Sequence, residues 1–449
     1  MVKIIKQKMQ DNLAVILLIV AVIALNIADM AFSEQVGGAG DVMPIILIAG
    51  ILLLSALSST LAKGTIFPSF LVALFAGMSL HDALQPIVQS TAILNTVVTI
   101  SAVYILFSGG LEISFASFKK ILLPTVLLSF IGLGISTFLL PAGLIILDGY
   151  LGLGISVTVA LLLGAILAST DPAAIIPVIK ELTFKKKEIK DIVISESALT
   201  DVTGTLVTFA FLFYLSTGGV FNSIADGFTA LNSTTSAFFL MKEIIIGILA
   251  GCVGYIMLHA YLLRRKKVSE QCSDVPLFIA APLVAFGLAA LFHGSGYLAS
   301  FVAGLLILTH EHVHKTESFF VSMTDGIAKP LVFILLGAMV DVSTLMAYIV
   351  PGLLAGLVFI FVVRPLSVFA SLYPWRKKMG LQSRDLWFIS FVRETGVIPA
   401  VLLLQTMNVA GLNLGPEFLS IGMWVIIMTL VILPPLTPWV ARRLGVTTN

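Results

Sequence analysis

Long apolar stretches recur along almost the whole chain and are separated by short polar segments. A helix needs about 20 apolar residues to cross the hydrocarbon core of a bilayer, and fewer where it is broken or packed inside a bundle. Of the 449 residues, 58% are hydrophobic and 11% are charged, whereas a soluble globular chain carries about 25% charged residues. These charges are too few to cover a surface that faces water, so the sequence predicts an all-α polytopic membrane protein embedded in a lipid bilayer.

The apolar stretches predict about 13–14 transmembrane helices in a single transmembrane domain that covers residues 1–449. The longest loop, near residues 215–237, leaves no room for a long water-soluble module. Nucleic acid is excluded as a partner, because the formal net charge is +2 and the chain has no basic stripe. The candidate spans lie near residues 13–32, 43–61, 66–79, 90–110, 121–146, 152–181, 191–215, 238–262, 275–292, 296–309, 326–342, 346–372, 386–408 and 417–440.

Lysine and arginine alternate between successive loops, whereas the intervening loops carry only acidic charge. Positive residues accumulate in the cytoplasmic loops of membrane proteins. The alternation therefore predicts an even number of spans, with both termini cytoplasmic, in the cell (inner) membrane. The first span, within the extra N-terminal segment 1–40, could instead be a signal peptide, but its length favours an uncleaved helix. The positive charges lie near residues 3–8, 63, 119–120, 185–187, 264–267, 315, 376–384 and 442–443.

The run Ser169-Thr170-Asp171-Pro172 interrupts the sixth span in the middle of apolar sequence. Proline removes a backbone donor and clashes with the preceding turn, so we expect the helix to break here. Within a membrane, a break is tolerated only where the freed backbone groups line a cavity or bind an ion. The alternative is a proline kink at which Asp171 caps the second half-helix, and the two interpretations are compatible.

Polar and small residues of the seventh span share one helix face, at about 100° per residue. Carboxylates and hydroxyls on one face form a hard-oxygen surface suited to a monovalent cation or a proton. The alternative is the solvated cytoplasmic end of a helix, which could apply to Glu196, but Asp201 lies deeper in the span. The face comprises Glu196, Ser197, Thr200, Asp201, Thr203 and Gly204.

The thirteenth span contains Arg393-Glu394-Thr395-Gly396. An arginine buried here requires a carboxylate partner, because an uncompensated buried charge is costly; otherwise it marks the end of a cytoplasmic loop. If residues 238–262 form a linker helix, residues 43–215 and 275–440 become two inverted six-helix repeats. The interrupted sixth and thirteenth spans are then the fifth member of each repeat, and this pairing indicates a transporter site with crossed broken helices.

Several motifs, in the same order along the chain, resemble the monovalent cation–proton antiporter superfamily of the sodium/proton exchanger type. Only the N-terminal span lies outside the resemblance. It implies a core domain with two unwound helices that cross at the ion site, and a dimerisation domain that makes the protein a homodimer. The motifs are Phe107-Ser108-Gly109-Gly110-Leu111-Glu112, residues 164–172 and 177–182, Glu196-Ser197 with Thr200-Asp201, residues 293–299, Leu335-Leu336-Gly337 and residues 393–399.

The resemblance also implies roles for individual residues. Asp201 would be the carrier carboxylate, which binds the transported Na⁺ together with Asp171. Asp171 and Thr170 would help to ligate the ion or would cap the crossing, with Ser197 and Thr200 as further ion ligands. In addition, Glu196 would pair with Arg393 to hold the core together.

The chain departs from the family pattern near the predicted site. Thr200 stands where the family has Asn or Asp before the carrier, and a single carboxylate there resembles the electroneutral branch, which exchanges one cation for one proton. Glu394 and Thr395 separate the arginine from its glycine, and Glu394 has no assigned role. Lys329 begins the eleventh span; in some relatives a lysine in that region pairs with the carrier acid, but its edge position favours snorkelling.

We therefore predict a secondary active antiporter, not an enzyme, that exchanges Na⁺, or alternatively Li⁺ or K⁺, for H⁺ by alternating access. A proton and the cation would compete for Asp201 and Asp171, which could titrate as a coupled pair. The chain has no nucleotide motif, and we expect no cofactor apart from the transported ions. Such exchange serves pH homeostasis.

The alternatives are a potassium/proton antiporter, a cation channel and an intramembrane aspartyl protease. The protease class would show Tyr-Asp and Gly-x-Gly-Asp, which this chain lacks at both aspartates. His310, His312 and His314 lie in a predicted cytoplasmic loop and could bind metal or sense pH, although a solvated loop is the favoured interpretation. Cys252 and Cys272 are too few for a disulfide scaffold or a metal framework.

Overall fold

The computed structural model describes residues 43–62, 68–113, 115–170, 179, 182–265, 275–307, 314–409, 411–412 and 414–448. These residues are almost entirely helical, and each predicted span from the second to the fourteenth has a helical counterpart. Seven of the described helices are long and apolar enough to cross a membrane, and further apolar helices are shorter. The predicted first span and the segment 1–40 lie outside the described residues. The chain is a multi-span membrane protein, as predicted.

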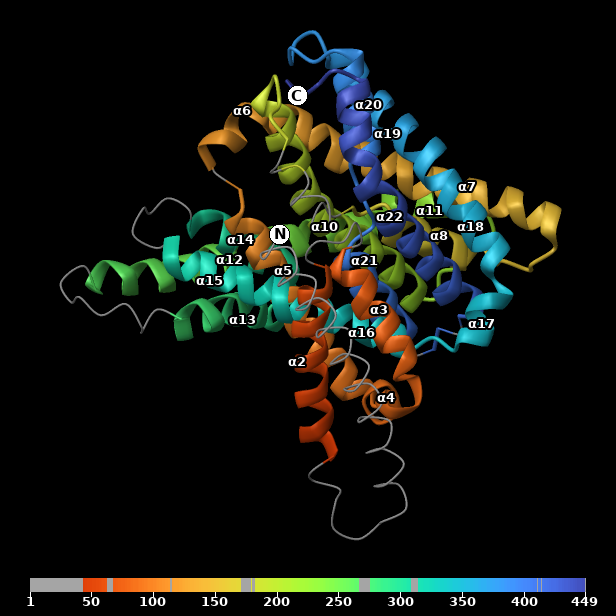
Figure 1. Cartoon of the computed structure of the whole chain (residues 1–449), viewed down its shortest axis with the longest axis horizontal. Helices are drawn as coiled ribbons and strands as arrows, with labels where there is room; N and C mark the ends of the chain where they lie inside the picture. The colour runs from red at the N-terminus through yellow and green to blue at the C-terminus, as the bar shows by residue number, and fades with distance from the viewer. Residues whose placement is uncertain are drawn as a thin grey trace, which may run out of the picture.

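One set of helices, here called the scaffold group, packs mainly on itself (Figure 1). Within it, α14 packs against α5, α12 and α13, while α3 packs against α16 and α2. The group comprises α2 (Met43–Ala62), α3 (Ser69–Ser79), α4 (His81–Val88), α5 (Thr91–Leu111), α12 (Thr234–Arg265), α13 (Val275–Leu291), α14 (Gly296–Ile307), α15 (His314–Met323), η4 (Thr324–Ala328) and α16 (Lys329–Ala338).

The remaining helices, here called the core group, contain both interrupted spans. Their main contacts join α7 to α8, α18 to α22, α10 to α6 and α19 to η1. The group comprises α6 (Phe115–Val126), η1 (Leu127–Gly132), α7 (Leu133–Leu151), α8 (Val157–Leu167), α10 (Lys187–Ser216), α11 (Ile224–Asn232), α17 (Val342–Ala347), α18 (Ile349–Val358), η5 (Phe359–Val363), α19 (Arg364–Leu372), η6 (Tyr373–Trp375), α20 (Ser383–Phe391), α21 (Val397–Met407) and α22 (Pro416–Arg443).

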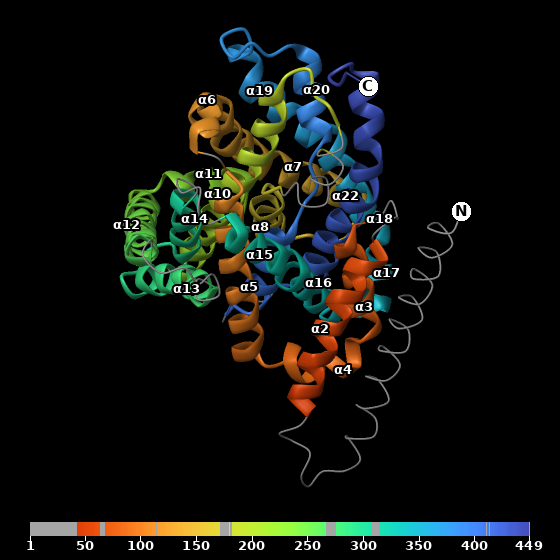
Figure 2. The same cartoon turned by 60° about the vertical axis from the view of Figure 1, so that its left-hand side comes forward.

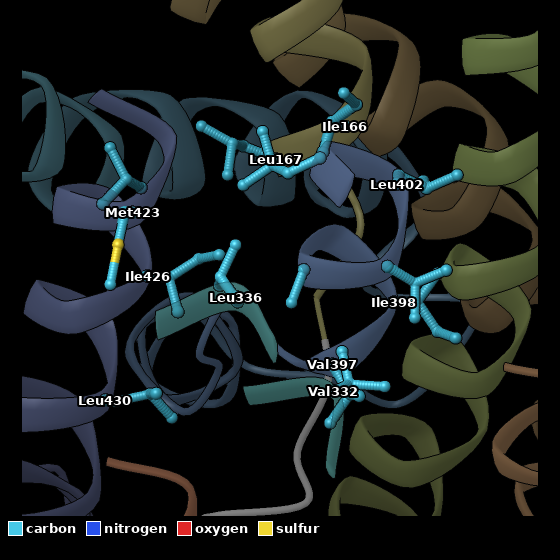
Figure 3. Close-up of a cluster of buried hydrophobic side chains, with 14 of the residues drawn as sticks. Ile166, Leu167, Val332, Leu336, Val397, Ile398, Leu402, Met423, Ile426 and Leu430 are labelled. Atoms are coloured by element: carbon cyan, nitrogen blue, oxygen red, sulfur yellow. The ribbon is translucent and has the colours of Figure 1, made fainter. Parts of the chain in front are cut away.

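Aliphatic side chains pack around α8 and α21, the half-helices that adjoin the two breaks (Figure 3). Ile166 and Leu167 at the end of α8, and Ile398 and Leu402 on α21, are completely buried. They belong to one continuous hydrophobic cluster that also includes side chains of α16 and α22. The two half-helices therefore end inside a dry, packed interior and not at a surface, which raises the cost of any polar group left there without a partner.

One end of the molecule is held together by contacts between the start of α10 and the C-terminal segment. Figure 2 shows α4 at the bottom and α20, with the C-terminus, at the top. At the top, the segment before α10 is anchored, because the Lys185 amide donates to Val446 O at 3.0 Å and the Thr448 amide donates to Thr183 O at 2.9 Å. Lys186 Nζ also forms a 2.9 Å ion pair with the buried Asp385. These contacts fix the start of α10, on which most of the predicted site residues lie.

Some boundaries differ from the predicted ones. The third span is continued by α4 after a 90° bend, and the predicted loop near 215–237 contains α11. The eleventh span is helical from His314 onward, well before the predicted start at residue 326. Hydropathy measures only the apolar part of a helix, and the polar residues of α15 continue the same helix beyond it. Lys329 therefore lies in the middle of a continuous helical segment and not at its edge.

Glycines set the closest approach within the scaffold group. A Cβ atom built on Gly304 of α14 would overlap the carbonyl of Phe107 on α5, and one built on Gly110 would overlap the carbonyl of Phe301. Small residues allow the backbones of membrane helices to approach this closely.

Replacing Gly304 with valine should separate α5 from α14 and destabilise the protein by about 1–3 kcal/mol, the usual cost of overpacking. Thermal unfolding of the purified protein in detergent measures the change. Gly287→Val is the matched control, because a Cβ atom at Gly287 in the neighbouring α13 meets nothing within 4 Å. Equal melting temperatures for the two variants would show that the α5–α14 contact does not need glycine.

Candidate functional site

Both interrupted spans lose their helical structure beside the middle of α10. The sixth span leaves the α-helix after Leu167, and Ser169 and Thr170 are not helical. The thirteenth span is interrupted between Phe391 and Val397. The helix therefore ends before Asp171 and Pro172, which lie outside the described residues. Helix ends leave backbone groups without intrahelical partners, and two hydroxyls of α10 lie against one of these groups, the carbonyl of Thr170.

Asp201 is buried on α10, with 6% of its surface exposed. Its Oδ1 accepts a hydrogen bond from Ser169 Oγ at 2.5 Å. The close approach depends on Gly204, because a Cβ atom there would lie 2.9 Å from the Cβ of Ser169. Ser169 was not among the predicted ligands, although its place beside Thr170 in the interrupting motif is a sequence signal for it.

The carbonyl oxygen of Thr170 lies against the next polar residues of α10. Ser197 Oγ donates to it at 2.6 Å, and Thr200 Oγ1 lies 3.4 Å away. The Thr200 hydroxyl also donates to Ser197 O at 2.8 Å. A hydroxyl that donates its proton keeps lone pairs that can accept a bond or ligate a cation. The structure thus brings Thr170, Ser197 and Thr200 together beside the helix break.

Glu196 and Arg393 form an ion pair inside the core group, and neither is exposed to solvent. Arg393 Nη2 donates to Val193 O at 3.1 Å, and Nη1 donates to Thr170 Oγ1 at 3.4 Å. One arginine thus joins the unwound part of the thirteenth span to α10 and to the end of the sixth span. This geometry places the predicted pair at the junction of both breaks.

A second buried arginine, Arg364, was not predicted from the sequence. It begins α19, is 3% exposed, and its Nη2 lies 4.0 Å from Glu196 Oε1. Glu394 is 1% exposed and interacts electrostatically with Arg393. The cluster therefore holds two arginines and two glutamates, and their formal charges cancel. A single arginine within the apolar run 346–372 is a clear signal, because ionisable residues inside spans are expensive.

Lys329 lies in the scaffold group and is 7% exposed. Its Nζ forms a 2.7 Å ion pair with Asp325, one turn earlier, whose side chain is 47% exposed. The stem of Lys329 is thus buried while its amino group pairs with an exposed carboxylate, and snorkelling stays a prediction. The π-helical turn η4, which contains Asp325, leads directly into the helix that Lys329 begins.

The site chemistry is that of hard oxygen ligands. Among the described residues, no group of three or more His, Cys, Asp or Glu side chains could hold a metal ion. His310 and His312 lie outside those residues, and of His314 only the backbone is described. What remains is a buried carboxylate, three hydroxyls and a non-helical backbone carbonyl, set beside a balanced cluster of charges. Such a site can bind either a proton or a monovalent cation.

Residues 45–443 match the family described as sodium/hydrogen exchanger, transmembrane. Over 400 residues the chain is 28% identical to the K(+)/H(+) antiporter NhaP of Alkalimonas amylolytica, an alignment of 86% of this chain and 64% of that protein. It is 26% identical over 362 residues to the Na(+)/H(+) antiporter 1 of Methanocaldococcus jannaschii, covering 78% of this chain and 80% of that protein. The chain thus spans about two thirds of the length of the K(+)/H(+) antiporter that it matches.

The fold is similar to a solved structure. The sodium proton antiporter MjNhaP1 from Methanocaldococcus jannaschii at pH 8 superposes with a TM-score of 0.73 and 21% sequence identity. The match covers 90% of this chain and 99% of that chain. Two helix groups and interrupted spans of this kind therefore belong to a known membrane fold.

Proposed function

Because the chain belongs to the sodium/hydrogen exchanger family, we propose that it exchanges a monovalent cation, Na⁺ in the first place, for H⁺ across the membrane. The observation that carries the proposal is the buried Asp201 carboxylate, which lies beside the broken sixth span and accepts a hydrogen bond from Ser169. K⁺ is the second candidate cation, because some of the relatives are named as K(+)/H(+) antiporters.

The exchange follows from the cost of an isolated buried charge. A carboxylate taken out of water is expensive unless it is neutralised or paired. Asp201 is therefore occupied either by a proton or by a cation, and the arrival of one releases the other. The hydroxyls of Ser197 and Thr200 and the carbonyl of Thr170 supply neutral oxygen atoms for the cation. Asp171 would complete the site from the sixth span.

The stoichiometry follows from the charge at the carrier position. Thr200 leaves Asp201 as a single acid at this point of α10, which supports an electroneutral exchange of one cation for one proton. The Glu196–Arg393 pair keeps its charges in both states and holds the two breaks in register. Neither residue then takes part in the exchange.

Alternating access requires one part of the protein to move against another. The core group carries the proposed ion ligands, and the scaffold group packs mainly on itself, so the core group is the part that moves. We further propose that the protein is a homodimer in the cell (inner) membrane. Both termini then face the cytoplasm, in agreement with the alternation of positive loops.

Proton movement in inverted membrane vesicles tests the function. Vesicles with an acidic interior receive Na⁺, Li⁺ or K⁺, and dequenching of a pH-sensitive dye reports proton efflux. We expect a response whose apparent KM for the cation rises as the pH falls, because protons and cations compete for Asp201, while the maximal rate stays constant. No response to any cation between pH 6 and 9, from folded protein, would rule out antiport. Cation current without coupled proton movement would indicate a channel.

A further inference from the structure

A small polar cluster connects the two helix groups at one end of their interface. Gln405, near the end of α21 in the core group, donates from Nε2 to the hydroxyl of Tyr297 at 2.5 Å and to Thr99 Oγ1 at 3.1 Å. Tyr297 begins α14 and Thr99 lies on α5, both in the scaffold group. One turn farther, Asn408 Nδ2 donates to Asn95 Oδ1 at 3.4 Å. These bonds link parts of the protein that must separate if the core moves.

Tyr297 also contacts the helix that carries Asp201. Its ring, 5% exposed, stacks on Phe209 of α10 at a centroid distance of 6.0 Å. Phe209 follows Asp201 by eight residues, which is about 12 Å along the helix axis. At about 100° per residue, positions 201, 205 and 209 form one stripe along α10. Tyr297 thus covers this stripe about two turns beyond the carrier carboxylate.

An open cavity adjoins this cluster. It has a volume of about 280 Å³ and is lined by Asn95, Thr96 and Thr99 of α5 and by Phe286 of α13, among others. The ring of Phe286 contacts that of Tyr297 at 5.4 Å between centroids. Tyr297 therefore lies between Phe286, which lines the cavity, and α10. Thr99 and Asn95, which accept the bonds from Gln405 and Asn408, line the same cavity.

The closed cluster is not fully satisfied. Among the described residues, Gln405 Oε1 is buried and has no hydrogen-bond donor. A buried acceptor without a hydrogen-bond donor destabilises this conformation of the protein, and contact with water or a cation would remove that cost. A few neutral hydrogen bonds therefore stabilise the contact between the two helix groups, and one unsatisfied acceptor destabilises it. A contact with such a small net stability can open and close.

We propose that Gln405 and Tyr297 form a gate that closes the ion site on the side where α5 and α14 begin. The proposal rests on the antiport function, since it assigns these residues to one step of alternating access. The positive loops lie at the opposite, cytoplasmic side, so this side faces the outside of the cell. The structure is therefore a conformation in which the ion site is closed to the outside. Gln405 moves with α21 and positions Tyr297 over the stripe that leads to Asp201. When the core moves, the bonds to α5 and α14 break and the cavity connects to the site.

Thiol labelling tests the gate without requiring transport. In full-length protein with Cys252 and Cys272 replaced by serine, Thr205→Cys places a reporter between Asp201 and Phe209. A charged, membrane-impermeant methanethiosulfonate reagent is then added from each face, in right-side-out and in inverted vesicles. Tyr297→Phe removes the bond between the two gate side chains, Gln405→Met removes the bonds of Gln405 to Tyr297 and to Thr99, and both variants keep the bulk. Each should raise labelling from the outer face about fivefold, the effect of losing a neutral hydrogen bond on a two-state equilibrium.

Thr96→Val is the matched control, because Thr96 lines the same cavity but, among the described residues, its hydroxyl bonds within its own helix, to Ala92 O at 2.7 Å. Labelling should stay unchanged in this variant. In transport assays, the two gate variants should lower the apparent KM for the outer cation by a similar factor, since the outward-open state becomes more populated. Unchanged labelling in both gate variants, or an equal increase from both faces, overturns the gate. If labelling responds but no antiport is found, the proposed function fails and the gate stands.

Discussion

Replacing Asp201 with asparagine should reduce cation–proton exchange by at least about 100-fold, the smallest usual cost of removing a side chain that transfers protons. Asparagine has nearly the same size, and its amide oxygen can still accept the bond from Ser169 Oγ. It cannot bind a proton or neutralise a cation. The variant should therefore fold normally and bind neither ion, so the loss appears in the transport rate and not in the amount of folded protein.

The dye-dequenching assay in inverted vesicles measures this loss, with Asp226→Asn as the matched control. Asp226 lies on the short helix α11, and its carboxylate accepts the backbone N–H groups of Asn222 and Ser223 at 2.8 Å. These bonds lower the pKa of Asp226, so this acid stays ionised throughout pH 6–9 and should not contribute to exchange. Exchange by Asp201→Asn at more than a tenth of the unmodified rate would mean that another group carries the proton.

The class of fold and the position of the helix breaks could be read from local sequence. Apolar length and a low content of charge are properties of short windows, and they indicated the membrane class and the spans. Pro172 indicated a break in the sixth span, yet the helix ends several residues earlier, after Leu167. The carbonyl of Thr170 is bonded by Ser197 and Thr200, about 30 residues away. Tertiary contacts of this kind cannot be seen in a local pattern.

The buried charges show a second limit of the sequence. Arginines and lysines were assigned to cytoplasmic loops, and this assignment missed Arg364, which lies inside an apolar span. Lys329 was placed at the start of its span, whereas α15 and η4 extend the helix in front of it. Charge inside a membrane protein depends on partners from other helices, such as Glu196 for Arg364, and partners are a property of the fold.

The polar cluster between the helix groups had no sequence signal. Gln405 and Thr99 are 306 positions apart, and neither belongs to a motif. Glutamine near the end of an apolar helix is ordinary in sequence, so only the packing of α21 against α5 gives it a role. Residues that position a moving element are therefore the part of the site that a single sequence predicts least.

Removing Arg393 should cost more stability than overpacking the α5–α14 contact at Gly304. Arg393→Leu leaves Glu196 completely buried without its partner, and breaking a buried ion pair usually costs about 3–5 kcal/mol. The bonds to Val193 O and Thr170 Oγ1 are lost as well. Among the described residues, Arg364 is the other positive charge beside Glu196, but its Nη2 lies 4.0 Å from Glu196 Oε1, so it compensates only in part.

Unfolding of purified protein in mixed detergent micelles measures the cost of Arg393→Leu. Arg384→Leu is the matched control: Arg384 also lies near a carboxylate, Asp385, at 4.0 Å, but its side chain is 43% exposed, and exposed pairs contribute about 0–1 kcal/mol. Arg393→Lys should fall between the two, because lysine keeps the charge but lacks the planar fork that reaches three partners. If Arg393→Leu were as stable as the unmodified protein, the ion pair would not hold the two broken spans together. The arrangement of Thr170 beside α10 would then have to depend on Ser197 and Thr200 alone.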